Sequence, residues 1–175
     1  MKEAISLAAR AVLQRHGLTG WSIEAVALEA GCAKGLVIYH GRTRNDLLAE
    51  VARRLAADRA THRLEPWRAF GAAGLDGLWT TLAAEVRSGE FAAWLTLSAL
   101  KVRDVSAAAA PPADFFPQLG SAARQALNLP NEASPEDTGR LIDAITDGFQ
   151  LQLLHGTPPE AVREVYHRFW LGLMK

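Results

Sequence analysis

The sequence predicts an all-helical protein, and two features of its 175 residues carry that prediction. Apolar residues recur at intervals of three and four along most of the chain, the spacing that aligns side chains on one face of an α-helix. Alanine, leucine, arginine and glutamate dominate the composition, and no alternating run of β-branched residues is long enough for a strand. A chain of this length can bury roughly 70% of the surface that it exposes when unfolded, so we expect a sizeable core.

Nine helices are expected, and helix-stopping residues separate them. The main breaks are Pro66, the glycine-containing residues 71–74, the alanine-proline segment 107–112 and the segment 130–135. Segment 107–112 is predicted to be a mobile connector. The expected helices are residues 2–16, 22–29, 33–40, 44–64, 72–88, 90–104, 114–128, 135–155 and 158–174.

The first helix is predicted to be an amphipathic helix of the folded protein. Ile5, Ala8 and Val12 share one face, while Glu3 and Arg10 interrupt the apolar core that a secretory signal would need. No segment is apolar over a length that could span a membrane. The single cysteine excludes an internal disulfide and fits a reducing compartment, so a cytoplasmic location is expected.

The second and third helices are expected to form a helix-turn-helix. Ile23, Val26 and Ala30 share one face, and Gly31 supplies the positive φ that a tight turn between helices requires. Ser22 suits the N-cap position, and the preceding tryptophan can pack against Val26. The third helix begins Ala-Lys-Gly-Leu-Val at residue 33, and its small side chains would allow close approach to base edges.

Charge is distributed unevenly, although the net charge is zero. Residues 1–54 contain eight lysine and arginine residues against five aspartate and glutamate residues, a surplus of three positive charges. Residues 55–175 contain eleven lysine and arginine residues against fourteen aspartate and glutamate residues, a surplus of three negative charges. A positive end is attracted to phosphates, but a surplus of three does not by itself decide that DNA is the partner.

Residues 5–51 resemble the TetR/AcrR family of bacterial transcriptional regulators. The shared pattern is an amphipathic helix ending at Gly17, the stretch from Ser22 to Gly31, Lys34-Gly35-Leu36-Val37, Tyr39-His40, and a basic residue before Leu47-Leu48. Two positions depart from it: Gly41 stands where the family usually has phenylalanine, and Ile38 where an aromatic residue or histidine is common. The resemblance implies a three-helix DNA-binding domain at 1–45 and a helical ligand-binding and dimerisation domain at 46–175.

The resemblance also implies which residues contact DNA. In the family, residues at the positions of Lys34, Tyr39 and His40 commonly touch phosphates or bases, and Arg44 corresponds to a usual lysine. Arg44 would meet a phosphate at the start of its helix, where Thr43 could act as the cap. Two alternatives stay open: Tyr39 could be a core aromatic, and the charged residues could simply be solvated. The predicted DNA-binding residues are Lys34, Gly35, Tyr39, His40, Thr43, Arg44 and Ser22.

In the family, the carboxyl-terminal bundle binds a small effector. Aromatic side chains with interspersed polar residues could enclose such a ligand, and the alternative is that they form plain core. The predicted lining residues are Trp79, Phe91, Trp94, Thr96, Ser98, Phe115, Phe116 and Phe149.

The last two helices carry apolar stripes that must be buried against another surface. The resemblance implies that they pair with the same helices of a second subunit, and the alternative is packing within one subunit. The predicted dimer interface comprises Leu141, Ile145, Gly148, Val162, Val165, Phe169 and Leu173.

No catalytic triad, nucleotide-binding loop or metal-hydrolase motif is present, so neither an enzyme nor a cofactor is expected. Asp58 with His62, and His155 with His167, are only isolated pairs for which structural roles are favoured over a metal site. The expected function is a repressor that a small apolar or amphipathic effector releases from operator DNA. The alternative is a ligand-binding helical protein of the same ancestry that has lost operator binding, which Gly41 and Ile38 motivate.

Overall fold

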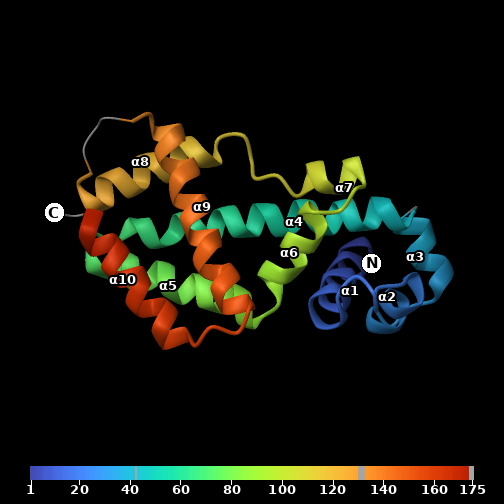
Figure 1. The fold of residues 1–175 in the computed structure, drawn as a ribbon. Helices are drawn as coiled ribbons and strands as arrows, with labels where there is room; N and C mark the ends of the chain where they lie inside the picture. The colour runs from blue at the N-terminus through green and yellow to red at the C-terminus, as the bar shows by residue number, and fades with distance from the viewer. Residues whose placement is uncertain (42, 130–132, 174–175) are drawn as a thin grey trace. The chain divides into compact units, whose positions relative to one another are not determined.

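The computed structural model describes residues 1–41, 43–129 and 133–173, and these residues form helices and loops without any strand (Figure 1). The all-helical class is therefore confirmed. Within the described residues, no helix is both long enough and apolar enough to cross a membrane. The α-helices are α1 Lys2–His16, α2 Ile23–Glu29, α3 Lys34–Gly41, α4 Arg44–Leu64, α5 Ala72–Arg87, α6 Glu90–Ser98, α7 Arg103–Ala108, α8 Phe115–Leu127, α9 Pro135–Leu154 and α10 Pro159–Leu173, and the 3₁₀ helix η1 is Glu65–Arg68.

Local capping explains where the amino-terminal helices begin and end. The hydroxyl of Ser22 accepts a hydrogen bond from the backbone N–H of Ala25 at 3.0 Å, which caps α2 as expected. Gly31 has a φ of 62°, the left-handed conformation that the turn before α3 requires. At the start of α4, Thr43 accepts from the N–H of Asp46, and the Asp46 carboxylate accepts from the N–H of Thr43, both at 3.1 Å. This reciprocal pair confirms Thr43 as the cap.

The predicted helix at 90–104 is wrong, because the structure has two helices there. Ser98, at the end of α6, donates its hydroxyl to the carbonyls of Trp94 and Leu95, and Val102 adopts an extended conformation before α7. The indole N–H of Trp94 donates to the carbonyl of Ala109 at 2.9 Å, which holds α7 back against α6. Leu100 packs on the same core from the loop between α6 and α7. The apolar spacing therefore continues through this loop although the helix ends before it.

The connector predicted at 107–112 is also partly wrong. Residues 107–108 are the last turn of α7, and Ala109 is buried in the core. A buried alanine that accepts a hydrogen bond is fixed by its surroundings, so only the residues after it remain available as a connector. Within the predicted break at 130–135, residues 130–132 lie outside the described residues, as does the predicted helix end at 174.

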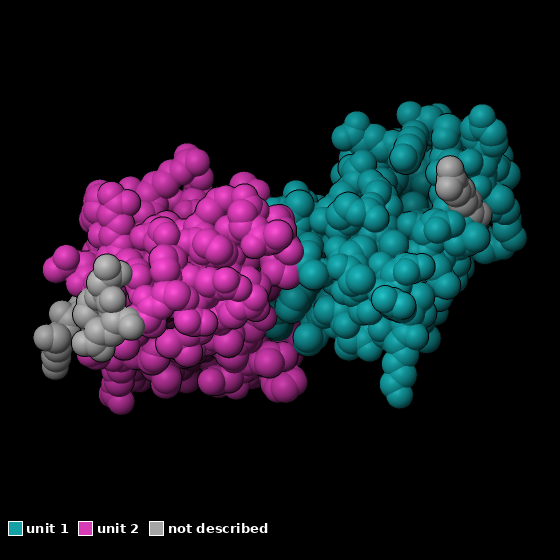
Figure 2. Space-filling view, turned by 90° about the horizontal axis from the view of Figure 1, so that it is seen from above, with its two compact units in different colours: residues 1–58, 88–110 teal, residues 59–87, 111–175 magenta. Residues whose placement is uncertain are grey.

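The described chain divides into two compact units, coloured separately in Figure 2. Unit 1 comprises residues 1–58 and 88–110, and unit 2 comprises residues 59–87 and 111–175. Helix α4 contributes residues to both units. This division describes how the chain packs and not what each part does. The boundary at residue 45 between the DNA-binding and ligand-binding domains therefore stays a prediction.

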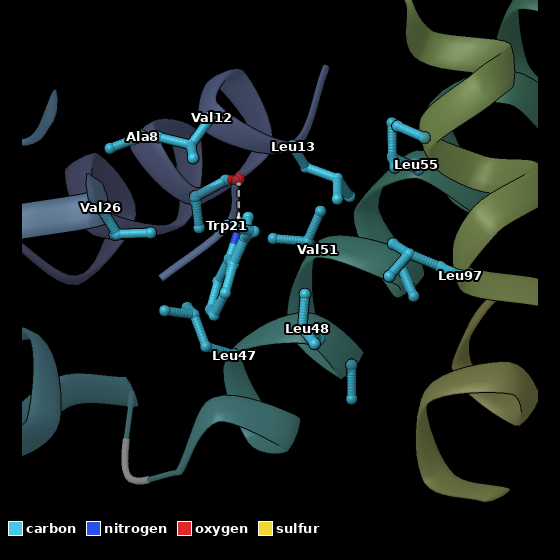
Figure 3. Close-up of a cluster of buried hydrophobic side chains, with 14 of the residues drawn as sticks. Ala8, Val12, Leu13, Trp21, Val26, Leu47, Leu48, Val51, Leu55 and Leu97 are labelled. Carbon is cyan, nitrogen blue, oxygen red and sulfur yellow. Dashed lines mark hydrogen bonds between the residues drawn. The ribbon is translucent and has the colours of Figure 1, made fainter. Parts of the chain in front are cut away.

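Trp21 lies in the core of unit 1 (Figure 3). Its indole N–H donates to the carbonyl of Ala9 in α1 at 2.9 Å, so the ring is buried without leaving an unpaired donor. Val26 of α2 and Leu47 and Leu48 of α4 belong to the same buried cluster. The helix-turn-helix is thereby packed against α1 and α4, which fixes the direction in which α3 presents its exposed face.

Unit 2 has an aromatic core centred on Tyr166 of α10. Its hydroxyl donates to the carbonyl of Leu75 in α5 at 2.7 Å. Burial raises the pKa of this hydroxyl, so it remains protonated and continues to donate. The rings of Trp79, Phe149 and Trp170 lie 5.3 to 6.0 Å from the ring of Tyr166 in edge-to-face or tilted arrangements.

Two arginines of α4 are buried in unit 2 with carboxylates from α5 and α9. Arg63 donates to Asp143 and Asp147, both at 2.6 Å, and also to Thr146 and Gln150. Arg59 donates to Asp147 at 3.0 Å and to Glu85 at 2.9 Å. We call Arg59, Arg63, Glu85, Asp143 and Asp147 the buried ionic cluster.

The buried ionic cluster contains three carboxylates for two guanidinium groups. Burial, followed by repulsion from Asp147, raises the pKa of Asp143 although Arg63 acts in the opposite direction. Carboxylates in such a cluster depend on their partners, because an unpaired buried charge is strongly destabilising. The cluster therefore attaches the carboxyl-terminal end of α4 to α9 and α5.

Candidate nucleic-acid interface

Helix α3 presents one face to the core and the opposite face to solvent. Val37 is completely buried, whereas Lys34, Gly35 and Ile38 are exposed. The side chain of Tyr39 is 78% exposed, which excludes the alternative that it is a core aromatic. The half-buried ring of His40 lies edge-on to it, with ring centroids 5.0 Å apart. Position 35 has open space where a Cβ would be, so this face offers little bulk to a groove.

Lys34 forms an ion pair with Glu24 of α2, a contact that the sequence did not predict. Both side chains are exposed, and the hydrogen bond from Lys34 lowers the pKa of Glu24. Pairs of this kind contribute little stability because water competes for both charges. Lys34 can therefore exchange Glu24 for a phosphate at little cost.

Arg44 projects from the start of α4, beside the ring of Trp21. Its guanidinium carbon lies 5.4 Å from the ring centroid, a cation–π distance. The buried ring restricts an otherwise flexible side chain, and Arg44 itself remains exposed. Thr43 is exposed as well, but its hydroxyl donates to Asp46 at 2.8 Å, so the structure employs it as a cap. Ser22 is similarly engaged at the start of α2.

A cleft of about 520 Å³ opens at the end of α3. A Cβ built on Gly41 would lie 3.4 Å from the nearest atom of Leu47, so Leu47 occupies part of the space that a side chain would use. Ile5, Tyr39, Gly41 and Leu47 are among the lining residues. Leu47 therefore fills part of the space beside Gly41, and the rest belongs to the open cleft.

The predicted ligand-lining residues separate into two groups. Phe91, Trp94, Thr96 and Ser98 belong to α6 in unit 1. The hydroxyls of Thr96 and Ser98 donate to carbonyls of their own helix, at 2.7 and 3.0 Å. Such contacts match the plain-core alternative for these residues, and the ligand role of this group stays a prediction.

The second group lies in unit 2. Trp79, Phe115 and Phe149 are buried in its core, and Phe116 packs against that core with Arg140 over its ring at 4.5 Å. Among these residues, the ring of Phe149 contacts Tyr166 rather than an open space. Unit 2 therefore brings this group together as packed core, and its role in ligand binding is likewise untested.

The predicted dimer residues lie on α9 and α10, mostly at the surface. Leu141 is 61% and Val165 is 51% exposed, and Leu173 is also exposed. Ile145, Gly148 and Phe169 are half-buried, and position 148 has open space where a Cβ would be. Val162 must be removed from the prediction, because it is completely buried in the core of its own subunit and cannot reach a partner.

One member of each isolated acid and histidine pair has a structural partner. Asp58 forms an ion pair with Arg10 of α1, and His167 lies 3.5 Å from Asp76 of α5. Among the residues that the structure describes, no group of three or more histidine, cysteine, aspartate or glutamate residues is arranged to hold a metal ion.

Comparison with known proteins finds a family model that matches the segment containing the helix-turn-helix. Residues 5–51 match the family model described as bacterial regulatory proteins, tetR family. The multidrug binding protein EbrR, solved with imidazole, is 26% identical over 95% of this chain and 93% of its own, with a TM-score of 0.65. EbrR solved with proflavin is 27% identical over 95% of this chain and 98% of its own, with a TM-score of 0.62.

A candidate TetR-family transcriptional regulator from Rhodococcus sp. has the same fold, with a TM-score of 0.76 and 21% identity over 99% of this chain and 98% of that one. No curated protein sequence matches the chain. The matched segment contains α1 to α3 and the start of α4, which are the elements that expose Lys34, Tyr39 and Arg44. Residues 5–51 are therefore similar to the bacterial regulatory proteins of the tetR family, a family of DNA-binding transcriptional regulators.

Proposed function

We propose that the protein is a repressor that binds operator DNA as a homodimer and releases it when a small apolar or amphipathic effector binds. It would act in the cytoplasm, where its DNA lies. The observation that carries the DNA-binding part is the exposed face of α3, where Tyr39 stands out from a helix anchored by buried Val37. Lys34 and Arg44 supply positive charge on either side of it for phosphates.

A dimer is proposed because one recognition helix reads too few bases for a specific site. Two-fold related subunits would read a near-palindrome, with half-sites about one helical turn apart or a multiple of that spacing. The exposed apolar residues Leu141 and Val165 support pairing through α9 and α10, since both would be covered in such an interface.

Effector control is proposed to act through α4, which contributes residues to both compact units. A ligand that displaces its carboxyl-terminal end would change the separation of the two recognition helices, and a dimer with changed spacing cannot satisfy both half-sites. The multidrug-binding relative supports ligand responsiveness. Thermodynamic reciprocity then requires operator DNA to weaken effector binding by the same factor as effector weakens DNA binding.

Lys34→Ala and Arg44→Ala test the phosphate contacts. Each is expected to reduce the slope of log K against log salt by about one unit, because one fewer counterion is released on binding. The measurement is fluorescence anisotropy of a labelled operator duplex at several salt concentrations. Arg168→Ala, which removes an exposed arginine of unit 2, is the matched control and should leave the slope unchanged. Equal slopes for all three variants and the wild type would remove Lys34 and Arg44 from the interface.

Tyr39→Phe tests the hydroxyl at the centre of the proposed interface. The variant should bind operator more weakly, by roughly fivefold or more if one hydrogen bond worth about 1 kcal/mol is lost. Its melting temperature should match the wild type, because the hydroxyl is on an exposed ring. Unchanged affinity together with a lowered melting temperature would show that the hydroxyl serves folding and not DNA.

A second candidate function is a ligand-binding protein that no longer binds an operator. The cleft beside Gly41 favours it, because glycine makes fewer contacts at the end of α3 than a larger side chain would, and the recognition helix would be held less firmly. Gel shifts with the DNA upstream of its own gene separate the two functions: the repressor shifts that DNA in preference to an unrelated duplex, and the alternative shifts neither.

A further inference from the structure

A groove of about 520 Å³ lies on unit 2, and its described lining residues are different from the predicted ligand residues. Leu64 at the end of α4, Trp67 in η1, Phe70 just beyond η1 and Ala122 on α8 form its apolar walls. Phe70 is 66% exposed, an unusual position for a large apolar ring. Grooves of this volume hold small organic molecules, and the aromatic walls suit a flat one.

The polar residues of the groove are one arginine and two glutamines, whose amides can both donate and accept hydrogen bonds. Gln118 and Gln125 flank Ala122 at the i, i+4, i+7 spacing that places all three on one face of α8. Gln118 donates one amide hydrogen to Asp114 at 2.6 Å and retains a second. Arg68 is the charged residue among those that line the groove, and carboxylate side chains are absent from its described lining.

The guanidinium of Arg68 can accept a ligand in place of its present partner. It contacts Glu65 at 3.1 Å, but both side chains are largely exposed, so their pair contributes little. A guanidinium binds a carboxylate through two parallel hydrogen bonds, which a point charge such as an ammonium cannot form.

Trp67 supplies an independent indication of a ligand. The residue is 5% exposed, and its indole N–H reaches no acceptor among the described residues. A buried donor without an acceptor is destabilising, so most such groups in native proteins are satisfied. Trp67 lines the groove, but its indole nitrogen is closed to solvent, so a ligand acceptor reaches it only if the wall of the groove opens.

We propose that this groove is the effector site of the protein and that it binds a flat aromatic carboxylate. The ring would lie between Phe70 and the apolar wall, and the carboxylate would contact Arg68 and the glutamine amides. The regulatory role of the groove rests on the proposed function, whereas the binding of a ligand to the groove does not. Arg68 is the charged residue among the described lining residues, and its guanidinium favours an anion over a planar cation.

The test uses 2-naphthoate, with 1-naphthylmethylammonium as a cation of similar size, measured by calorimetry and by the shift in melting temperature. We expect naphthoate to bind the wild-type protein more tightly than the ammonium compound. Arg68→Met should weaken naphthoate binding by about tenfold or more, because the variant loses a hydrogen bond to a charged group. Arg168→Met is the matched control, because Arg168 is an exposed arginine of unit 2 that also contacts a glutamate; it should bind naphthoate like the wild type.

Ala122→Met gives a second, uncharged test, because its longer side chain fills the groove while α8 keeps a helix-forming residue. It should abolish naphthoate binding without loss of helical circular dichroism. The inference is overturned if naphthoate fails to bind, if the ammonium compound binds more tightly, or if Arg68→Met and Arg168→Met bind naphthoate equally. Operator affinity is measured separately: naphthoate that binds the groove without weakening DNA binding would contradict effector control through this groove and leave the binding site itself supported.

Discussion

Leu141→Arg is expected to convert the proposed homodimer into a monomer and to abolish tight operator binding. Leu141 is 61% exposed on α9, so the arginine is solvated in the monomer and should not impair folding. In the proposed dimer it would be buried without a partner, which costs about 3–5 kcal/mol for each subunit. A two-fold interface contains both copies, so the dimer dissociation constant should rise by roughly four orders of magnitude or more.

Analytical ultracentrifugation gives the oligomeric state, and anisotropy gives the operator affinity. Ala84→Arg is the control, because it places the same charge on an exposed position of α5 in unit 2. It should remain dimeric. Phe169 is less suitable for this test, since its ring packs against Phe149 and Trp170 of its own subunit. A dimeric Leu141→Arg with normal operator affinity would show that the subunits pair through another surface.

Arg63→Met is expected to lower the free energy of unfolding by about 3–5 kcal/mol, because Asp143 and Asp147 lose a buried partner. For a chain of this size, that corresponds to a fall of roughly 6–20 °C in melting temperature. Chemical denaturation and calorimetry measure the two quantities. Arg168→Met should change the free energy by no more than about 0.5 kcal/mol, since its ion pair with Glu164 is exposed. Similar losses in the two variants would contradict the importance assigned to the buried ionic cluster.

The same cluster predicts a pH dependence. The pKa of Asp143 is raised above its ordinary value of 3.8, so the folded protein binds this proton more readily than the unfolded chain. The destabilisation caused by ionised Asp143 is therefore present at neutral pH and is relieved as the pH falls through the raised pKa. The free energy of unfolding of Asp143→Asn minus that of the wild type should therefore rise as the pH increases from 4 to 7. An unfolding free-energy difference that is constant between pH 7 and 4 would contradict this assignment.

The amino-terminal helices were predictable because their boundaries depend on local chemistry. Ser22, Gly31 and Thr43 cap or terminate helices through contacts with residues at most five positions away. The break between α6 and α7 was not predictable in this way. It depends on a hydrogen bond from Trp94 to a carbonyl fifteen residues further along, and periodicity carries no information about such contacts.

The buried ionic cluster was not predicted, because isolated arginine and aspartate residues in a sequence are usually interpreted as solvent-exposed. A signal was nevertheless present: Arg59 and Arg63 continue the buried stripe of α4 that includes Leu48, Ala52 and Leu55. A charged pair in register with an apolar stripe predicts buried partners elsewhere in the fold. The sequence alone could not show which carboxylates they are.

The candidate interface was predicted in part. The resemblance selected the residues of α3 and α4, and the exposure of Tyr39 then removed the core alternative. The pairing of Lys34 with Glu24 required the structure, because it joins two helices across the turn. The groove at Trp67 and Arg68 was also beyond sequence reasoning, since its second wall comes from α8, about fifty residues away in the chain.

Selection from a randomised duplex library tests the central claim most directly, because it assumes no operator sequence. The protein should enrich a near-palindromic sequence and bind it at least 10³-fold more tightly than random duplex at physiological salt, with two subunits on each site. A Lys34→Ala, Tyr39→Phe double variant should lose most of that affinity while keeping its melting temperature. If no sequence is enriched and all duplexes bind equally, the protein is not a sequence-specific repressor.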